Sequence, residues 1–211
     1  MQLVISRDLL LQAINLISKA ADKRHNMVIL GNMKLALTDS QLVMVASDLE
    51  LELQATLNLP ASACKQPGEI TVPANKFKDI VKLLPDGLPV SITVANDNQC
   101  LIVCGSSRFK LSTLPAQDFP LLGEPEQVTP IQLGREDLVD LLDKTHFAMA
   151  VQDVRYYLTG MLFEVKERQL ATVSTDGHRL ALARTVIACD ESVALDAILP
   201  RKAVLELQRL L

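Results

Sequence analysis

The residues best suited to chemistry in this sequence are Asp176 and His178, which flank Gly177. A carboxylate beside an imidazole is a common pairing for general acid–base catalysis. The sequence contains no nucleophile motif, glycine-rich phosphate loop or metal-ligand cluster to accompany the pair. His25 and His146 are isolated and are expected to be structural. We therefore predict a turn at Asp176, a protein that is not an enzyme, and no need for a metal or cofactor.

The cysteines are the other reactive side chains. Cys100 and Cys104 lie close together within a strand-like run, whereas Cys64 and Cys189 are isolated. No second Cys/His pair lies nearby to complete a tetrahedral metal site, and no helix start suggests a redox motif. We expect buried free thiols, because free cysteine behaves as a small apolar residue.

Composition narrows the class of protein. The chain has 211 residues, of which 49% are hydrophobic and 22% are charged, and its net charge is −4. It has no apolar run of the roughly 20 residues that a membrane span needs, and no secretory signal is visible. We expect a soluble, cytoplasmic protein without a membrane partner. The net charge argues against a generic basic nucleic-acid binder but permits a locally basic surface.

The elements that must position these residues are arranged as an internal repeat. An offset of 128 sets Arg7 against Arg135 and Asp48 against Asp176, and one residue of slippage then sets Pro73 against Pro200. A pattern that holds over about 80 residues predicts two homologous domains. We place them at residues 1–122 and 131–211, with a linker at 123–130 in a proline-rich stretch.

Local patterns predict the fold class. Apolar residues at helical spacing predict helices over residues 7–19, 74–84 and 135–147, the first with Ser6 as its N-cap. Strict alternation over residues 49–54 predicts a strand. Each repeat unit is strand, helix, then three strands, and each domain contains two units. The expected fold is α+β, with antiparallel sheets and with helices on one face.

The second copy stops at Leu211, the counterpart of Leu84. The strands predicted at 89–95 and 99–114 in the first copy therefore have no counterpart. We expect the second domain to be incomplete by about a third, in a fragment of a longer chain. Its last helix should leave apolar residues poorly covered, namely Val204, Leu207, Leu210 and Leu211.

Three segments resemble a known family. Residues 111–120 (LSTLPAQDFP), 152–158 (QDVRYYL) and 175–180 (TDGHRL) are similar to the bacterial replicative sliding clamps, the β subunits of DNA polymerase III. The resemblance covers the whole chain. It implies three such domains per subunit, and two subunits that close head to tail into a ring around duplex DNA. Helices would line the inner, concave face, and the antiparallel sheets would lie outside.

The resemblance also implies function and partners. It predicts a processivity factor, a homodimer that encircles duplex DNA without sequence specificity. Its partners would be DNA polymerase III, other polymerases, the clamp loader and repair proteins. The alternative is a non-catalytic interaction scaffold with the same fold that does not encircle DNA.

Site residues carry over from the matching positions. Expected DNA contacts are Arg24, Gln152, Tyr156, Tyr157, Lys78, Lys82, Lys202 and Arg209. Relatives often have basic residues where this chain has Gln12 and Asn75, which puts those two contacts in doubt. The expected peptide-binding pocket comprises Arg155, Leu158, Thr175, Gly177, His178, Arg179 and Leu180. The expected dimer interface comprises Lys76, Arg108, Phe109 and Leu111, with Phe109 and Leu111 as apolar anchors.

Charge on the predicted helices supports a DNA-facing surface in part. Helices 7–19, 75–84 and 201–211 have more basic than acidic residues, whereas helix 135–147 has two basic and four acidic residues. Together the four carry +3 in a chain of net charge −4. Weak phosphate attraction from such helices would hold DNA without reading its sequence.

Overall fold

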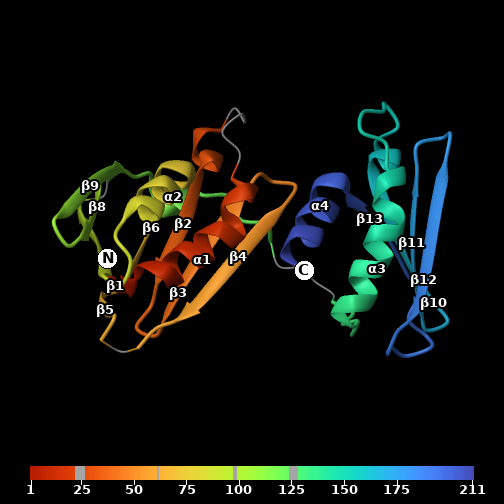
Figure 1. Cartoon of the computed structure of the whole chain (residues 1–211), viewed down its shortest axis with the longest axis horizontal. Helices are drawn as coiled ribbons and strands as arrows, with labels where there is room; N and C mark the ends of the chain where they lie inside the picture. Colours follow the sequence, from red (N-terminus) through yellow and green to blue (C-terminus); the bar gives the residue numbers. More distant parts are fainter. Residues whose placement is uncertain (22–26, 61, 97–98, 124–127) are drawn as a thin grey trace. The chain divides into compact units, whose positions relative to one another are not determined.

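The computed structural model describes residues 1–21, 27–60, 62–96, 99–123 and 128–211. It divides into two compact units, unit 1 (Met1–Gly123) and unit 2 (Glu124–Leu211). Figure 1 shows helices packed on sheets in each unit. The predicted DNA contact Arg24, and also His25, lie outside the described residues.

The described residues of unit 1 form two antiparallel sheets and two α-helices. One sheet has the strand order β5-β1-β7-β8-β9, and the other has the order β4-β3-β2-β6. The strands are β1 (Gln2–Ser6), β2 (Asn32–Leu37), β3 (Gln41–Ser47), β4 (Glu52–Asn58), β5 (Cys64–Gln66), β6 (Gly68–Pro73), β7 (Pro89–Asn96), β8 (Gln99–Cys104) and β9 (Ser107–Ser112). The helices are α1 (Arg7–Ile17) and α2 (Ala74–Leu83), with short 3₁₀ turns η1 (Ser18–Ala20), η2 (Val28–Gly31) and η3 (Ala116–Asp118).

Apolar spacing explains why the two helices pack where they do. The buried residues of α1 include Leu10, Ile14 and Ile17, which fall on one helical stripe. Phe77 and Val81 form the equivalent stripe of α2. Both stripes enter one apolar core shared with the two sheets. Ser6 precedes α1 as predicted, but its side chain makes no capping hydrogen bond within the described part of the chain.

One predicted strand is partly wrong. Residues 49–51 do not belong to β4, which begins at Glu52. Asp48 instead accepts backbone hydrogen bonds at its Oδ1 from Glu50 (3.1 Å) and Leu51 (2.8 Å). Leu49 has a φ of +74°, which a strand cannot include. The carboxylate of Asp48 therefore folds the first residues of the alternating run into a turn.

Unit 2 has one antiparallel sheet with the order β12-β11-β10-β13. Helices α3 and α4 pack on it, α3 against β11 and β12, and α4 against β10 and β13. Its elements are α3 (Arg135–Thr145), η4 (His146–Ala148), η5 (Tyr156–Thr159), β10 (Gly160–Lys166), β11 (Gln169–Thr175), β12 (Leu180–Val186), β13 (Leu195–Pro200) and α4 (Arg201–Leu210).

Most elements of unit 1 have a counterpart in unit 2 at the offset of the predicted repeat. At the offset that aligns Arg7 with Arg135, η2 aligns with η5, β3 with β11 and β4 with β12. With one residue of slippage, β6 and α2 align with β13 and α4. The predicted fold class, α+β with antiparallel sheets, is confirmed.

The first strand of the repeat is reduced in unit 2. Unit 1 has the full strand β1, which pairs with β7 along its length. At the equivalent place in unit 2, Gln132 forms a single bridge to Ala188.

Helix α4 is covered better than predicted. Val204 is fully buried against Leu142, Met149 and Met161, while Leu207 and Leu211 pack beside this cluster. The expected exposure holds for Leu210, which is 40% exposed. Leu142 of α3, Met149 just after η4 and Met161 of β10 already supply the apolar surface that Val204 needs.

Candidate functional site

The turn between β11 and β12 is built by its own side chains. The Thr175 hydroxyl donates to the carbonyl of Arg179 (2.7 Å) and accepts from the Gly177 amide (3.1 Å). Asp176 Oδ1 accepts from the amides of His178 and Arg179, each at 3.0 Å. These backbone hydrogen bonds hold the pKa of Asp176 below its ordinary value. The carboxylate is therefore committed to shaping the turn, as the sequence predicted.

Arg155 reaches this turn from the segment before η5. Its guanidinium donates from Nε (3.0 Å) and Nη2 (2.8 Å) to the two carboxylate oxygens of Asp153. The Arg155 amide also donates to Asp153 Oδ1 (2.8 Å). Hydrogen bonds from the Arg155 side chain and then from its amide lower the pKa of Asp153 to about 2. The same pairing raises the pKa of Arg155.

Gly177 is required where Arg155 meets the turn. Its φ is +88°, a conformation that residues with a side chain rarely adopt. A methyl group on its Cα would lie 3.4 Å from Nη2 and 3.7 Å from Nη1 of Arg155. The end of the guanidinium therefore lies directly over the glycine.

Phe147 is a part of this surface that sequence reasoning missed. The Cζ atom of Arg179 lies 5.7 Å from the centre of the Phe147 ring, within cation–π range. Phe147 is 51% exposed. Phe147 is the last residue of the predicted helix 135–147, and no role was predicted for it. The structure instead ends α3 at Thr145 and turns Phe147 outward on η4.

The two leucines predicted as pocket walls differ in burial. Leu158 is half-buried on η5, where its amide donates to the Arg155 carbonyl (2.9 Å) and its carbonyl accepts from the Ala150 amide (3.0 Å). Leu180 is 66% exposed and pairs with Thr175 across β11 and β12. The structure thus joins Arg155 to Leu158 through the backbone, and gathers Arg155, Arg179 and Leu180 around one turn.

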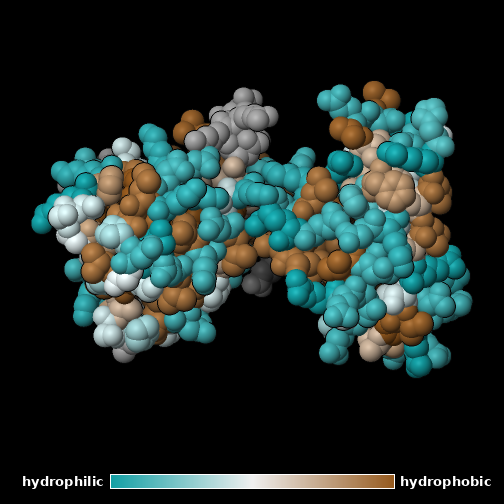
Figure 2. Space-filling model, viewed as in Figure 1, coloured by the Kyte–Doolittle hydropathy of each residue, from teal (hydrophilic) through white to brown (hydrophobic). Residues whose placement is uncertain are grey.

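Three residues that were predicted to contact DNA are exposed: Gln152 on the segment that leads into η5, and Tyr156 and Tyr157 at the start of η5. The two tyrosine rings meet edge to face, with centres 5.9 Å apart. Tyr156 is 82% exposed, and Val154 between these positions is fully open to solvent. Figure 2 shows exposed hydrophobic side chains at the end of unit 2 that carries this segment.

The lysines and the arginine on α2 and α4 that were predicted to contact DNA differ in their exposure and in their contacts. Lys78 is half-buried and donates from Nζ to the Ser18 hydroxyl (3.1 Å), whereas Lys82 is exposed. Arg209 pairs with Glu206 at 2.6 Å, so much of its charge is neutralised locally. Lys202 is half-buried at the start of α4.

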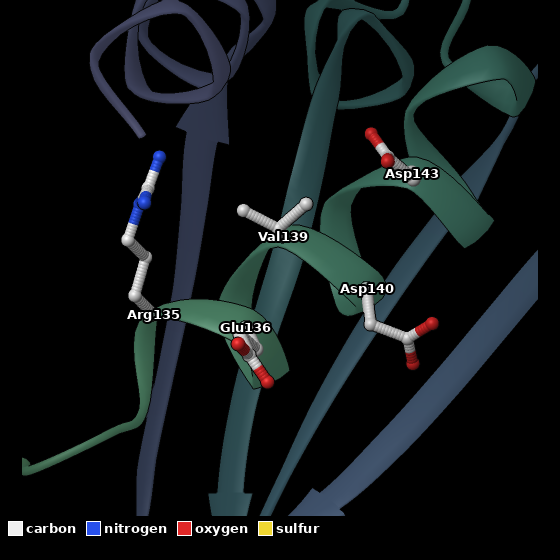
Figure 3. Close-up of a pocket in the computed structure, with 5 residues that line it drawn as sticks. All are labelled: Arg135, Glu136, Val139, Asp140 and Asp143. Atoms are coloured by element: carbon white, nitrogen blue, oxygen red, sulfur yellow. The ribbon is translucent and has the colours of Figure 1, made fainter.

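Helix α3 carries an acidic groove instead of a basic surface. An open pocket of about 370 Å³ runs along it, lined by Arg135, Glu136, Val139, Asp140 and Asp143. Figure 3 shows these side chains along the helix. Lys144 pairs with Asp140 (2.6 Å), and the Gln208 amide donates to Asp143 (2.7 Å). The acidic composition noted in the sequence is therefore a surface property of α3.

Strand β9 carries three of the predicted interface residues. It lies at one end of the five-stranded sheet and pairs with β8 within the described residues. Arg108 is exposed and Phe109 is half-buried, as is consistent with a surface role. Leu111 is 6% exposed and belongs to the core of unit 1. Its side chain is therefore occupied inside its own unit, in contrast to the expected surface anchor. Lys76 is exposed on α2.

Neither a metal cluster nor a membrane helix is found in the described part of the chain. No group of three or more His, Cys, Asp or Glu side chains there could hold a metal ion. No described helix is both long and apolar enough to cross a bilayer.

Tandem repeats of a helix and an antiparallel sheet define the sliding-clamp class of fold, and comparisons with known proteins agree. Residues 1–123 match the family model "DNA polymerase III beta subunit, N-terminal domain", and residues 132–211 match "DNA polymerase III beta subunit, central domain". The chain belongs to the DNA polymerase III beta subunit family.

Named relatives cover the whole chain. It is 43% identical over 211 residues to the beta sliding clamp of Pseudomonas putida and 40% identical to that of Escherichia coli. It spans 57% of the length of each of these relatives.

Solved structures have the same fold. The DNA polymerase III subunit beta of Pseudomonas aeruginosa matches with a TM-score of 0.92 at 41% identity, over 100% of this chain and 56% of that chain. The Bacillus subtilis sliding clamp matches with a TM-score of 0.94 at 29% identity, over 100% of this chain and 57% of that chain.

Proposed function

We propose that this chain forms part of a DNA polymerase processivity factor, a ring-forming clamp that encircles duplex DNA and tethers replication and repair proteins to it. The observation that carries the proposal is the family match, which extends over both repeat units. The clamp has no reaction of its own to catalyse. It acts by enclosure, so that a bound polymerase stays with its template.

Retention on DNA requires attraction that is weak and independent of sequence. Lysine and arginine side chains supply this through contacts with phosphates. In this proposal Lys78, Lys82 and Lys202 face the DNA together with Arg209 and Arg24. Gln152, Tyr156 and Tyr157 form a second contact, where the exposed tyrosine rings stack on bases of single-stranded template.

Partners dock through the peptide-binding pocket, a surface formed by Arg155, Leu158 and the turn from Thr175 to Leu180. A short peptide with one aliphatic and one aromatic anchor would insert there, since Leu158 and Leu180 offer apolar contact beside the turn at Gly177. The polymerase, the clamp loader and repair proteins would compete for this site.

Ring closure uses the edge of β9. A strand edge can add a strand from another subunit, and Phe109, Arg108 and Lys76 would support that contact. Because the relatives are longer than this chain, we propose that a third clamp domain provides the opposing edge. Two subunits would then close head to tail, as a heterologous contact does when its rotation completes a ring.

The test measures retention on circular and linear DNA. The complete protein, with any sequence that follows this chain naturally, is loaded by its clamp loader onto a nicked plasmid and separated from free protein by gel filtration. A clamp stays on the circle in high salt and slides off after the plasmid is cut once. Release from both forms at low as well as high salt would favour the interaction scaffold, and retention on the cut plasmid at low salt would favour a groove binder.

A further inference from the structure

Asp153 makes the most complete set of contacts with a residue of the peptide-binding pocket. Its two carboxylate oxygens receive the Nε and Nη2 hydrogens of Arg155 at 3.0 and 2.8 Å. A third hydrogen bond, from the Arg155 amide at 2.8 Å, fixes the backbone between the two residues. Paired hydrogen bonds of this kind define the plane of a guanidinium as well as its position. Asp153 therefore determines where the Arg155 side chain points.

That direction is toward the turn of the pocket. Nη2 and Nη1 of Arg155 lie over the α-carbon of Gly177, and the Asp153 side chain is more sheltered than that of Arg155, with exposures of 18% and 51%. An arginine without this partner has four rotatable side-chain bonds and would leave Gly177 uncovered. Asp153 is not among the pocket residues that were expected from the sequence. It nevertheless hydrogen-bonds to one of them, Arg155, which lies over another, Gly177.

We propose that Asp153 is a positioning residue of the peptide-binding pocket, which holds Arg155 over Gly177 and so shapes the wall that a peptide anchor meets. This inference rests on the proposed function of the pocket. Asp153 acts through Arg155 and does not itself touch the peptide.

The ion pair between Asp153 and Arg155 also determines which kind of peptide anchor is favoured. The Asp153 carboxylate offsets the positive charge of Arg155, so the rim beside Gly177 is less basic than the residue type suggests. An uncharged anchor is then favoured over an acidic one. Without Asp153, the Arg155 side chain would no longer be held over Gly177, and its positive charge would no longer be offset.

The test uses the 211-residue chain and a fluorescein-labelled pentapeptide with leucine and phenylalanine anchors. Fluorescence anisotropy gives the Kd for the wild type, Asp153→Asn, Asp153→Glu, Arg155→Ala and the Asp153→Asn/Arg155→Ala double variant. The matched control is Asp190→Ala, because Asp190 closes a similar exposed turn through Ser192 in the same unit. The Arg155 Nε–H signal in NMR reports the position of the side chain.

We expect Asp153→Asn to weaken peptide binding about tenfold, since it removes charged hydrogen bonds that fix the wall. Arg155→Ala should lose a similar amount, and the double variant should lose no more than Arg155→Ala alone. Asp153→Glu should recover part of the affinity, and Asp190→Ala should bind as the wild type does. The Arg155 Nε–H signal should shift in Asp153→Asn.

The experiment distinguishes failure of the positioning role from failure of the peptide-binding pocket. If the wild type binds the peptide and Asp153→Asn binds equally well with an unmoved Arg155 signal, the positioning role is wrong and the pocket stands. Additive losses in the double variant would also overturn the coupling. If the wild type binds no peptide, the pocket itself fails in this chain, and the inference fails with it.

Discussion

Arg7, the first residue of α1, caps the end of α2 by donating from Nε to the carbonyl oxygen of Val81 (3.2 Å). A second bond runs from Nη2 to the Lys82 carbonyl (2.9 Å), and Nη1 pairs with Asp86 (2.7 Å). The last carbonyls of a helix lack intrahelical partners, and a cation there also complements the helix dipole. One side chain thus ties the two helices of unit 1 together.

Arg7→Ala should therefore destabilise unit 1. We expect a loss of about 1–3 kcal/mol in the free energy of unfolding, because charged hydrogen bonds to partly buried carbonyls are removed. Urea denaturation followed by circular dichroism measures it. Lys110→Ala, at an exposed position on β9, is the control and should change little. An Arg7→Ala protein as stable as this control would contradict the capping role.

Gly177→Ala should strain the turn on which the Arg155 guanidinium lies. The left-handed backbone at Gly177 costs a residue with a side chain about 1–2 kcal/mol, whereas the new methyl group would only come into ordinary contact with the guanidinium, 3.4 Å from Nη2. We expect lower stability of unit 2 by that amount, together with weaker binding of the anchor peptide. Thermal unfolding and anisotropy measure the two effects. Gly123→Ala is the control, since nothing lies within 4 Å of the position that its added methyl would occupy.

Lys82→Ala tests phosphate contact by α2. Lys82 is exposed, so its removal should leave folding intact and weaken binding to all duplex sequences alike. The slope of log K against log salt concentration should fall by about one, as expected for one lost phosphate contact. Titration of two unrelated duplexes at several salt concentrations measures this. A loss confined to one sequence would mean that Lys82 reads bases.

Glu136→Gln tests the acidic groove of α3. If α3 lines the DNA-facing surface, as the family resemblance implies, its carboxylates repel the phosphates and limit affinity. Removing one of them should tighten DNA binding about twofold at low salt and less at high salt. Glu167→Gln, in the exposed turn between β10 and β11, serves as the comparison. Equal binding by wild type and Glu136→Gln would place this groove away from DNA.

The Asp153–Arg155 pair should resist acid. Because pairing lowers the pKa of Asp153 from 3.8 to about 2, its stabilising contribution is complete above about pH 4 and is lost as the pH falls through 2. An NMR titration of the Asp153 carboxyl carbon measures the midpoint. In Arg155→Ala the midpoint should move up toward 3.8, while that of Asp190 stays in place. An unchanged Asp153 midpoint would mean that Arg155 does not set its pKa.

Much of the fold could be predicted from the sequence because burial leaves a periodic trace. The stripe of Leu10, Ile14 and Ile17 indicates α1, and the same stripe at the repeat offset indicates α3. Side-chain hydrogen bonds leave no such trace. The alternation after Asp48 favoured a strand, yet one carboxylate accepting two amides makes those residues a turn.

The candidate site was predictable only in part. The turn at Asp176 follows from its residue types, and the resemblance supplied Arg155 and Leu180. Asp153 and Phe147 were missed because their roles depend on partners brought near by folding, namely Arg155 and Arg179. Leu111 shows the opposite error, since its place on an edge strand did not reveal that its side chain points into the core. The roles of these residues in binding stay predictions.

In both units, the residues that stabilise the fold are different from the residues that are exposed on the helices. Helices α2 and α3 both bury an apolar stripe, but lysines outnumber carboxylates among the exposed residues of α2, whereas most exposed residues of α3 are carboxylates. Substitutions outside the stripe change the charge of one helix without disturbing the interior of either unit. In the proposed clamp, such exchanges would strengthen or weaken the contact with DNA phosphates one helix at a time.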